Sequence, residues 1–141
     1  MSQFFTKREI LFYEKPGCAG NKKQKDLLTS KGIIFKVKNL LDTPWTFDSL
    51  GSFFVGLEKD EIVNVFAPKI KKNEIDIDKL SKKELIEYMI KEPILIKRPL
   101  IQVDEEKICG FNLAKLNKIL NLKLDTDKQI GTCQSSDSCL T

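Results

Sequence analysis

Cys18 is the residue whose sequence surroundings are best suited to chemistry. It follows a short apolar run at 10–13 and a proline–glycine break, and it stands where a polar, helix-forming segment begins. The N–H groups and the dipole of a helix N-terminus stabilise an anion, and Lys22 adds positive charge in the first turn. These effects favour the thiolate, which is the nucleophilic form. An inert, buried cysteine is the alternative, but the polar and glycine-flanked surroundings favour an accessible, reactive thiol.

Arg98 is the second candidate for a site residue. The chain has 24 basic residues, of which only Arg8 and Arg98 are arginines. A guanidinium can bind an oxyanion through two parallel hydrogen bonds, which a lysine cannot do. If the segment before the third strand approaches the helix that follows Cys18, then Arg98 can hold an oxyanion over the thiolate. A surface ion pair with a carboxylate such as Glu92 is an equally weighted alternative.

The other three cysteines have weaker claims to chemistry. Cys109 falls in an apolar strand and is expected to be a small core residue. Cys133 and Cys139 lie in a polar tail, where they are either resolving thiols that attack an adduct on Cys18 or incidental, with a slight preference for the latter. No pair has CxxC spacing and the chain has no histidine, so we predict no metal site.

Composition excludes several classes of function. The absence of histidine removes Ser-His and Cys-His catalysis. The net charge of +4 is mild and the acids are interleaved with the lysines, which does not indicate nucleic-acid binding. No apolar run is long enough for a membrane helix, and the first residues do not resemble a secretory signal. We therefore expect a cytoplasmic monomer that binds neither nucleic acid nor membrane.

The pattern of elements predicts how these residues are positioned. A strand at 10–13, a helix at 18–30 and a strand at 33–40 form a βαβ unit. A helical insert at about 44–92 follows. Its first helix is capped by Thr46 and carries a stripe of apolar residues (Phe47, Leu50, Phe53, Phe54). A short helix at 60–66, ended by Pro68, is expected next, and a helix with a Ser81–Glu84 capping box follows and ends at Pro93.

The last part of the domain is predicted to be a hairpin and a helix. A strand begins after Pro99, a turn at 104–107 leads into a strand at 108–111, and Asn112 caps the final helix. The order βαβ, helices, ββα predicts a thioredoxin-like α/β fold, with a four-stranded mixed sheet and helices on both faces. We expect a single domain over 1–123 and a flexible tail over 124–141.

Two segments carry a resemblance to a known family. Residues 12–18 read FYEKPGC, and residues 93–100 read PILIKRPL, close to the "HPILIxRPI" signature. The chain thereby resembles the ArsC/Spx family of thioredoxin-fold proteins, over roughly residues 10 to 120. It is most similar to the nitrogenase-associated subgroup, whose further marks are Asn21, Gln24-Lys25, the segment 40–46 and the run Ala67-Pro68-Lys69.

The resemblance implies roles for particular residues. In glutaredoxin-coupled arsenate reductases of this family, the cysteine after the first strand attacks arsenate, and glutathione forms a mixed species that glutaredoxin resolves. By position, Cys18 would be that nucleophile, Arg98 the oxyanion arginine and Pro99 the cis-proline facing the active loop. Asn21 and Lys22 stand where the reductases have a Ser-Arg pair that binds the substrate. No bound cofactor is implied, only glutathione as a co-substrate.

A second hypothesis is a non-enzymatic protein. Gly110 stands where the reductases have an arginine, and the insert offers only Lys69 or Lys71 in place of another. The CxxC switch of Spx regulators is absent too, because Asn21 occupies its second position. The alternative function is therefore a regulatory or nitrogenase-associated accessory protein that binds a protein partner.

Overall fold

A four-stranded mixed sheet forms the centre of the protein in the computed structural model, which describes residues 9–120. The strands are β1 (Ile10–Glu14), β2 (Lys36–Asn39), β3 (Leu100–Val103) and β4 (Glu106–Cys109), in the order β2-β1-β3-β4. β2 is parallel to β1, whereas β3 and β4 are antiparallel to their neighbours. This topology confirms the predicted fold class.

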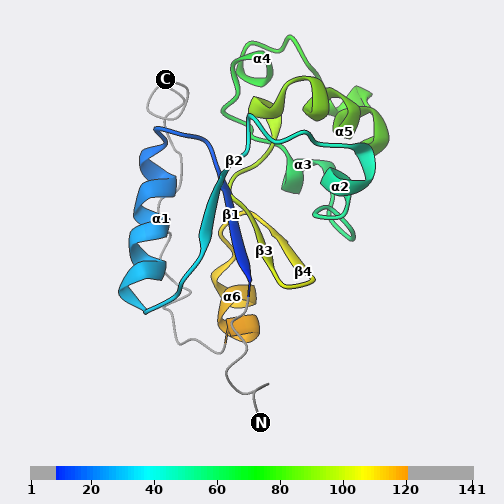
Figure 1. Cartoon of the computed structure of the whole chain (residues 1–141). Helices are drawn as coiled ribbons and strands as arrows, with labels where there is room; N and C mark the ends of the chain where they lie inside the picture. The colour runs from blue at the N-terminus through cyan, green and yellow to red at the C-terminus, as the bar shows by residue number, and fades with distance from the viewer. Residues whose placement is uncertain (1–8, 121–141) are drawn as a thin grey trace.

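The βαβ unit begins the sheet, and α1 (Ala19–Ser30) connects its two strands (Figure 1). α1 ends where predicted, because Gly32 adopts a positive φ of 76° and the backbone N–H groups of Lys31 and Gly32 satisfy the last carbonyls. β2 is half the predicted length, and all four of its residues are exposed. It lies at an edge of the sheet and pairs with β1 alone, so its alternating pattern does not mark a buried face.

The insert contains short helices, namely α2 (Phe47–Gly51), α3 (Lys59–Ile62), α4 (Pro68–Lys71) and α5 (Lys82–Lys91), with 3-10 turns η2 (Ile77–Lys79) and η3 (Pro93–Leu95). Thr46 caps α2 as predicted. The predicted apolar stripe is wrong in part: Phe47 is 41% exposed, while Phe53 and Phe54 are buried beyond the end of α2.

The predicted helix at 60–66 is confirmed only in its first turn. α3 ends at Ile62, and Val63 forms a β-bridge with Ile96. The backbone N–H of Asn64 then donates to the carbonyl of Leu95 at 2.8 Å. Tertiary pairing with the segment before β3 thus overrides a helical pattern that is too short to persist by itself. Pro68, predicted to end this helix, instead begins α4.

The capping-box helix α5 is confirmed. The Ser81 hydroxyl accepts from the N–H of Glu84, and the Glu84 carboxylate accepts from the N–H of Ser81. Hydrogen bonding by the Ser81 backbone, and next by its side chain, lowers the pKa of Glu84. The apolar face of α5 is buried through Leu85, Ile86 and Met89.

The hairpin is tighter than predicted, because only Asp104 and Glu105 connect β3 to β4, and Asp104 has a φ of 54°. α6 (Leu113–Leu120) follows, and the Asn112 side chain accepts from the N–H of Lys115 as an N-cap should.

The two faces of the sheet carry separate hydrophobic cores, which places helices on both sides as predicted. One core joins the sheet to α1 and α6 (Ile10, Phe12, Leu28, Ile101, Val103, Ile108, Leu116). The other joins the insert to Leu100 on β3, with Tyr13 and Cys109 packed against it. Figure 1 shows the insert gathered beyond one end of the strands, on the side away from α1 and α6. Cys18 lies where β1 gives way to α1.

Candidate active site at the start of helix α1

A tight turn carries Cys18 into α1. The N–H of Cys18 donates to the carbonyl of Lys15 at 3.1 Å, and Gly17 has the positive φ (82°) that this turn requires. Cys18 is the N-cap residue of α1, and its own carbonyl accepts from the N–H of Lys22 at 3.0 Å. The sulfur therefore lies at the positive end of the helix dipole, as predicted.

The predicted accessibility of Cys18 is wrong, because the residue is only 4% exposed. The physical reason is that its polar neighbours bond to one another inside the protein. Asn21 is 1% exposed; its Oδ1 accepts from the N–H of Lys15 and its Nδ2 donates to Gln24 at 2.9 Å. The polar sequence here reflects internal hydrogen bonding.

The two residues predicted to bind substrate have different positions. Asn21 holds the turn closed, so its amide is occupied by the chain itself. Lys22 lies outside, with its side chain 74% exposed and 3.0 Å from Asp26 on the next turn of α1.

Arg98 and Pro99 form the segment directly before β3. The Arg98–Pro99 peptide bond is cis, and Pro99 is buried with its carbonyl accepting from the N–H of Gly110 at 2.8 Å. Arg98 is partly buried and interacts electrostatically with Lys15. The carboxylate proposed as its alternative partner, Glu92, binds Lys69 at 2.7 Å. Arg98 thus belongs to the group of residues around the turn.

Lys15 completes this group and is the residue that sequence reasoning missed. It is only 3% exposed. Its pKa is lowered, first by burial and then by the charge of Arg98, while Cys18 acts in the opposite direction. Lys15 therefore interacts electrostatically with both Cys18 and Arg98. The available signal was a lysine directly before the Pro-Gly-Cys turn.

Cys109, predicted to be a core residue, is partly exposed and packs at the edge of a core. It lies on the edge strand β4, packs against the insert, and has its Sγ 3.8 Å from the carbonyl oxygen of Glu61. Burial raises the pKa of this thiol to about 12. Cys18 and Cys109 are both free thiols. Cys133 and Cys139 lie outside the described residues.

Gly110, where the family resemblance implies an arginine, has a backbone conformation that disfavours a side chain. Gly110 has a φ of 84°, and a Cβ there would lie 3.1 Å from Cε of Lys97. Lys97 thus covers the place from which a side chain at 110 would extend. In the insert, Lys69 is held by Glu92, whose hydrogen bond is the main cause of a raised Lys69 pKa.

Within residues 9–120, no group of three or more potential metal ligands is present. No helix in this part of the chain has the length and apolar character needed to cross a membrane.

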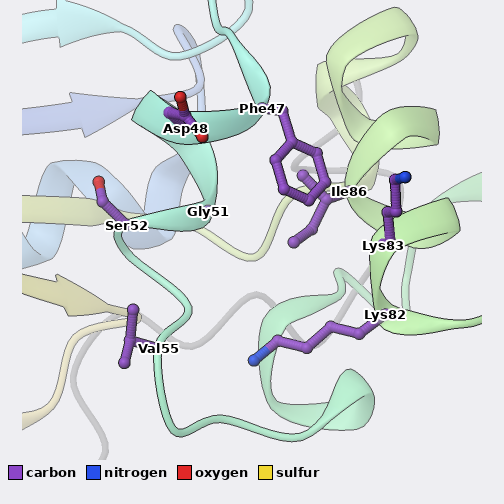
Figure 2. A pocket seen from close by; sticks show the side chains of 8 residues that line it. All are labelled: Phe47, Asp48, Gly51, Ser52, Val55, Lys82, Lys83 and Ile86. Carbon is purple, nitrogen blue, oxygen red and sulfur yellow. The ribbon is translucent and has the colours of Figure 1, made fainter.

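A separate groove of about 360 Å³ lies on the insert between α2 and α5. Figure 2 shows Phe47 and Ile86 facing each other in it, with Val55 at its rim. Lys82 crosses it to donate to the carbonyl of Phe54 at 2.7 Å. None of the residues that line it belongs to the group around Cys18.

Comparison with known proteins identifies the class. The sequence pattern of the ArsC family matches residues 13–119, so the chain belongs to the ArsC family. An uncharacterized 15.7 kDa protein from the draG 3′ region of Rhodospirillum rubrum is 35% identical over 90% of this chain and 89% of its own length. The Streptococcus mutans global transcriptional regulator Spx is 26% identical, over 79% of this chain and 82% of its own. The predicted family resemblance is confirmed.

Solved structures agree on the fold. An arsenate reductase from Vibrio cholerae superimposes with a TM-score of 0.66 at 20% identity, covering 84% of this chain and all of its own. An ArsC family related protein from Bacteroides fragilis gives 0.67 at 23% identity, over 78% and 96%. The protein therefore has the thioredoxin-like fold of arsenate reductases.

Proposed function

We propose that this protein is a thiol oxidoreductase in which Cys18 is the nucleophile. The observation that carries the proposal is the position of Cys18 at the N-cap of α1, near Lys15, whose charge interacts with both Cys18 and Arg98. A helix N-terminus and nearby cations favour a thiolate and attract anionic reactants. The cis-proline Pro99 adjoins Arg98, as the family resemblance implied.

The most specific substrate that we propose is arsenate. The Cys18 thiolate would attack arsenic(V) and form an S–As bond as an oxygen leaves as water. Glutathione would then form a disulfide with Cys18 and release arsenite, the two sulfurs supplying the two electrons. A glutaredoxin would reduce this mixed disulfide. An external thiol suits the structure, because the pKa of Cys109 is raised to about 12 and its side chain is packed against the insert.

A second candidate is a regulatory or accessory protein that binds a protein partner. It is supported by the similarity to Spx, whose members are named global transcriptional regulators, and by the glycine at 110 in place of an arginine. For either function we propose a cytoplasmic location, which suits a reduced thiol.

The test is a glutathione- and glutaredoxin-coupled assay with arsenate. We expect turnover by the wild type, none by Cys18→Ser, and a loss of about 100-fold or more in Arg98→Ala. Cys109→Ser is the matched control and should keep nearly full activity. Turnover retained by Cys18→Ser would contradict the proposal. No turnover by the wild type, together with a stoichiometric partner captured equally by wild type and Cys18→Ser, would favour the regulatory function.

A further inference from the structure

Strand β2 has an open edge on the side away from β1. It is the outermost strand of the order β2-β1-β3-β4, at the margin of the sheet in Figure 1. The N–H of Leu40 donates to the carbonyl of Glu14 at 2.7 Å, so the even-numbered residues here direct their backbone groups toward β1. Val37 therefore directs its N–H and C=O away from the sheet. Outward groups of this kind are a template for a further strand.

The side chains along this edge combine exposed apolar groups with lysines. Ile34 is 76% exposed and Val37 is 47% exposed. Within residues 9–120, no ion pair engages Lys36 or Lys38. Leu40 is buried in the core of the insert, so by alternation the two lysines lie on that side of the sheet and Val37 lies on the other. The edge thus offers positive charge on one side and an apolar side chain on the other.

A second copy of this chain does not match the edge. Two β2 strands paired antiparallel about Val37 would place Lys36 of each copy opposite Lys38 of the other. Like charges that lie directly opposite each other destabilise a strand pair, and lysines on an edge strand are a common means of preventing self-association. An acidic segment reverses the sign of this interaction. The lysines that oppose a second copy therefore attract an acidic partner.

We propose that β2 is a docking edge for an extended segment of a partner protein in which acidic residues alternate with apolar ones. The segment adds to the sheet as a fifth strand and bonds to the N–H and C=O of Val37. Its acidic side chains lie beside Lys36 and Lys38, and its apolar side chains lie on the other side, beside Val37. The proposal does not depend on the chemistry of Cys18.

The experiment measures the binding of two labelled octapeptides to the full chain by fluorescence anisotropy. One peptide alternates valine with glutamate and the other alternates valine with lysine, so the two have the same apolar side chains and opposite charge. We expect the glutamate peptide to bind at least about tenfold more tightly. In the double variant Lys36→Glu/Lys38→Glu this preference should reverse. The matched control Lys83→Glu/Lys91→Glu, which changes the net charge equally but on α5, should keep the preference.

Amide hydrogen exchange, measured by NMR for each residue, tests the strand geometry. The glutamate peptide should slow exchange at Val37 about tenfold or more and leave Lys38 unchanged, because the N–H of Lys38 faces β1. The proposal is overturned by equal binding of the two peptides, by a preference that also reverses in the α5 variant, or by binding without protection of Val37. Protection of Val37 before any peptide is added would show that this chain or a second copy already covers the edge, and would overturn it too.

Discussion

Cys18, at the start of α1, and Cys109, at the end of β4, are two free thiols that differ in what surrounds them. Cys18 is 4% exposed, yet it lies at the positive end of α1 and near Lys15, whose charge interacts with both Cys18 and Arg98. Cys109 is packed against the apolar insert, and burial raises its pKa to about 12. Cys109 is nevertheless the more exposed of the two residues, so exposure alone does not set the character of a thiol; the groups packed around the sulfur contribute as well.

The two cysteines also lie in two kinds of surroundings, an apolar core and a polar junction. The face covered by the insert is a hydrophobic core in which Cys109 serves as an apolar residue. The junction between β1 and α1 is instead closed by polar bonds through Asn21 and Gln24. Such a junction can hold charge next to a nucleophile while water is kept away, which strengthens the interaction between them.

The largest expected effect is a difference between the alkylation rates of Cys18 and Cys109. In the native protein at pH 7, we expect iodoacetamide to modify Cys18 at least about 100-fold faster than Cys109. A pKa of about 12 leaves Cys109 roughly one thiolate in 10⁵ at this pH. Peptide mass mapping over time measures both rates in one sample. Equal rates would remove the distinction between the two sites.

The second effect is a pH dependence of stability that belongs to Cys109. Its pKa is raised from 9.0 in an ordinary setting to about 12 in the fold. The unfolded chain thus loses this proton near pH 9 while the folded protein keeps it. The stabilisation is complete below pH 9, and the free energy of unfolding then falls by up to about 1.4 kcal/mol per pH unit toward pH 12.

The measurement for this effect is urea unfolding under reducing conditions between pH 8 and 11, for wild type and Cys109→Ala. Because the remaining groups titrate in both proteins, the difference between them isolates Cys109. The advantage of the wild type should shrink as the pH rises. A difference independent of pH would show that the thiol is not enclosed as described.

Asn21→Ala should have a smaller effect, confined to the Cys18 junction. The change removes the acceptor for the N–H of Lys15 and the donor to Gln24, leaving buried polar groups unsatisfied. We expect a loss of about 1–3 kcal/mol in the free energy of unfolding. Hydrogen exchange should rise at residues 15–18 and stay unchanged at β4. An equal change in hydrogen exchange at residues 15–18 and at β4 would contradict the role of Asn21 in holding the turn closed.

The smallest effect is expected at the far side of the insert. Ser81→Ala removes the cap of α5 and should cost about 1 kcal/mol in the free energy of unfolding. The alkylation rate of Cys18 should not change, because no contact of Ser81 reaches the junction. A changed rate would mean that the insert and the junction are energetically coupled.

Sequence patterns predicted the helix ends that depend on hydrogen bonds between residues close together in the chain. The capping box at Ser81, the N-caps at Thr46 and Asn112 and the stop at Gly32 all involve residues within a few positions of each other. Their hydrogen bonds form wherever the chain is helical, so the sequence determines them directly. The same locality made Cys18 a candidate, since a helix begins just after it.

Tertiary structure decided what depends on residues far apart in the chain. It paired Val63 with Ile96, which replaced a predicted helical segment, and it brought Arg98 beside Lys15. It also buried Cys18 and Lys15 among polar residues that look exposed in the sequence. The sequence by itself determined the family, the order of the strands and the longer helices, and the cysteine at the start of α1. Which charges surround that cysteine was decided only when β1, α1 and the segment before β3 packed together, because electrostatic interactions depend on distance in space and on burial.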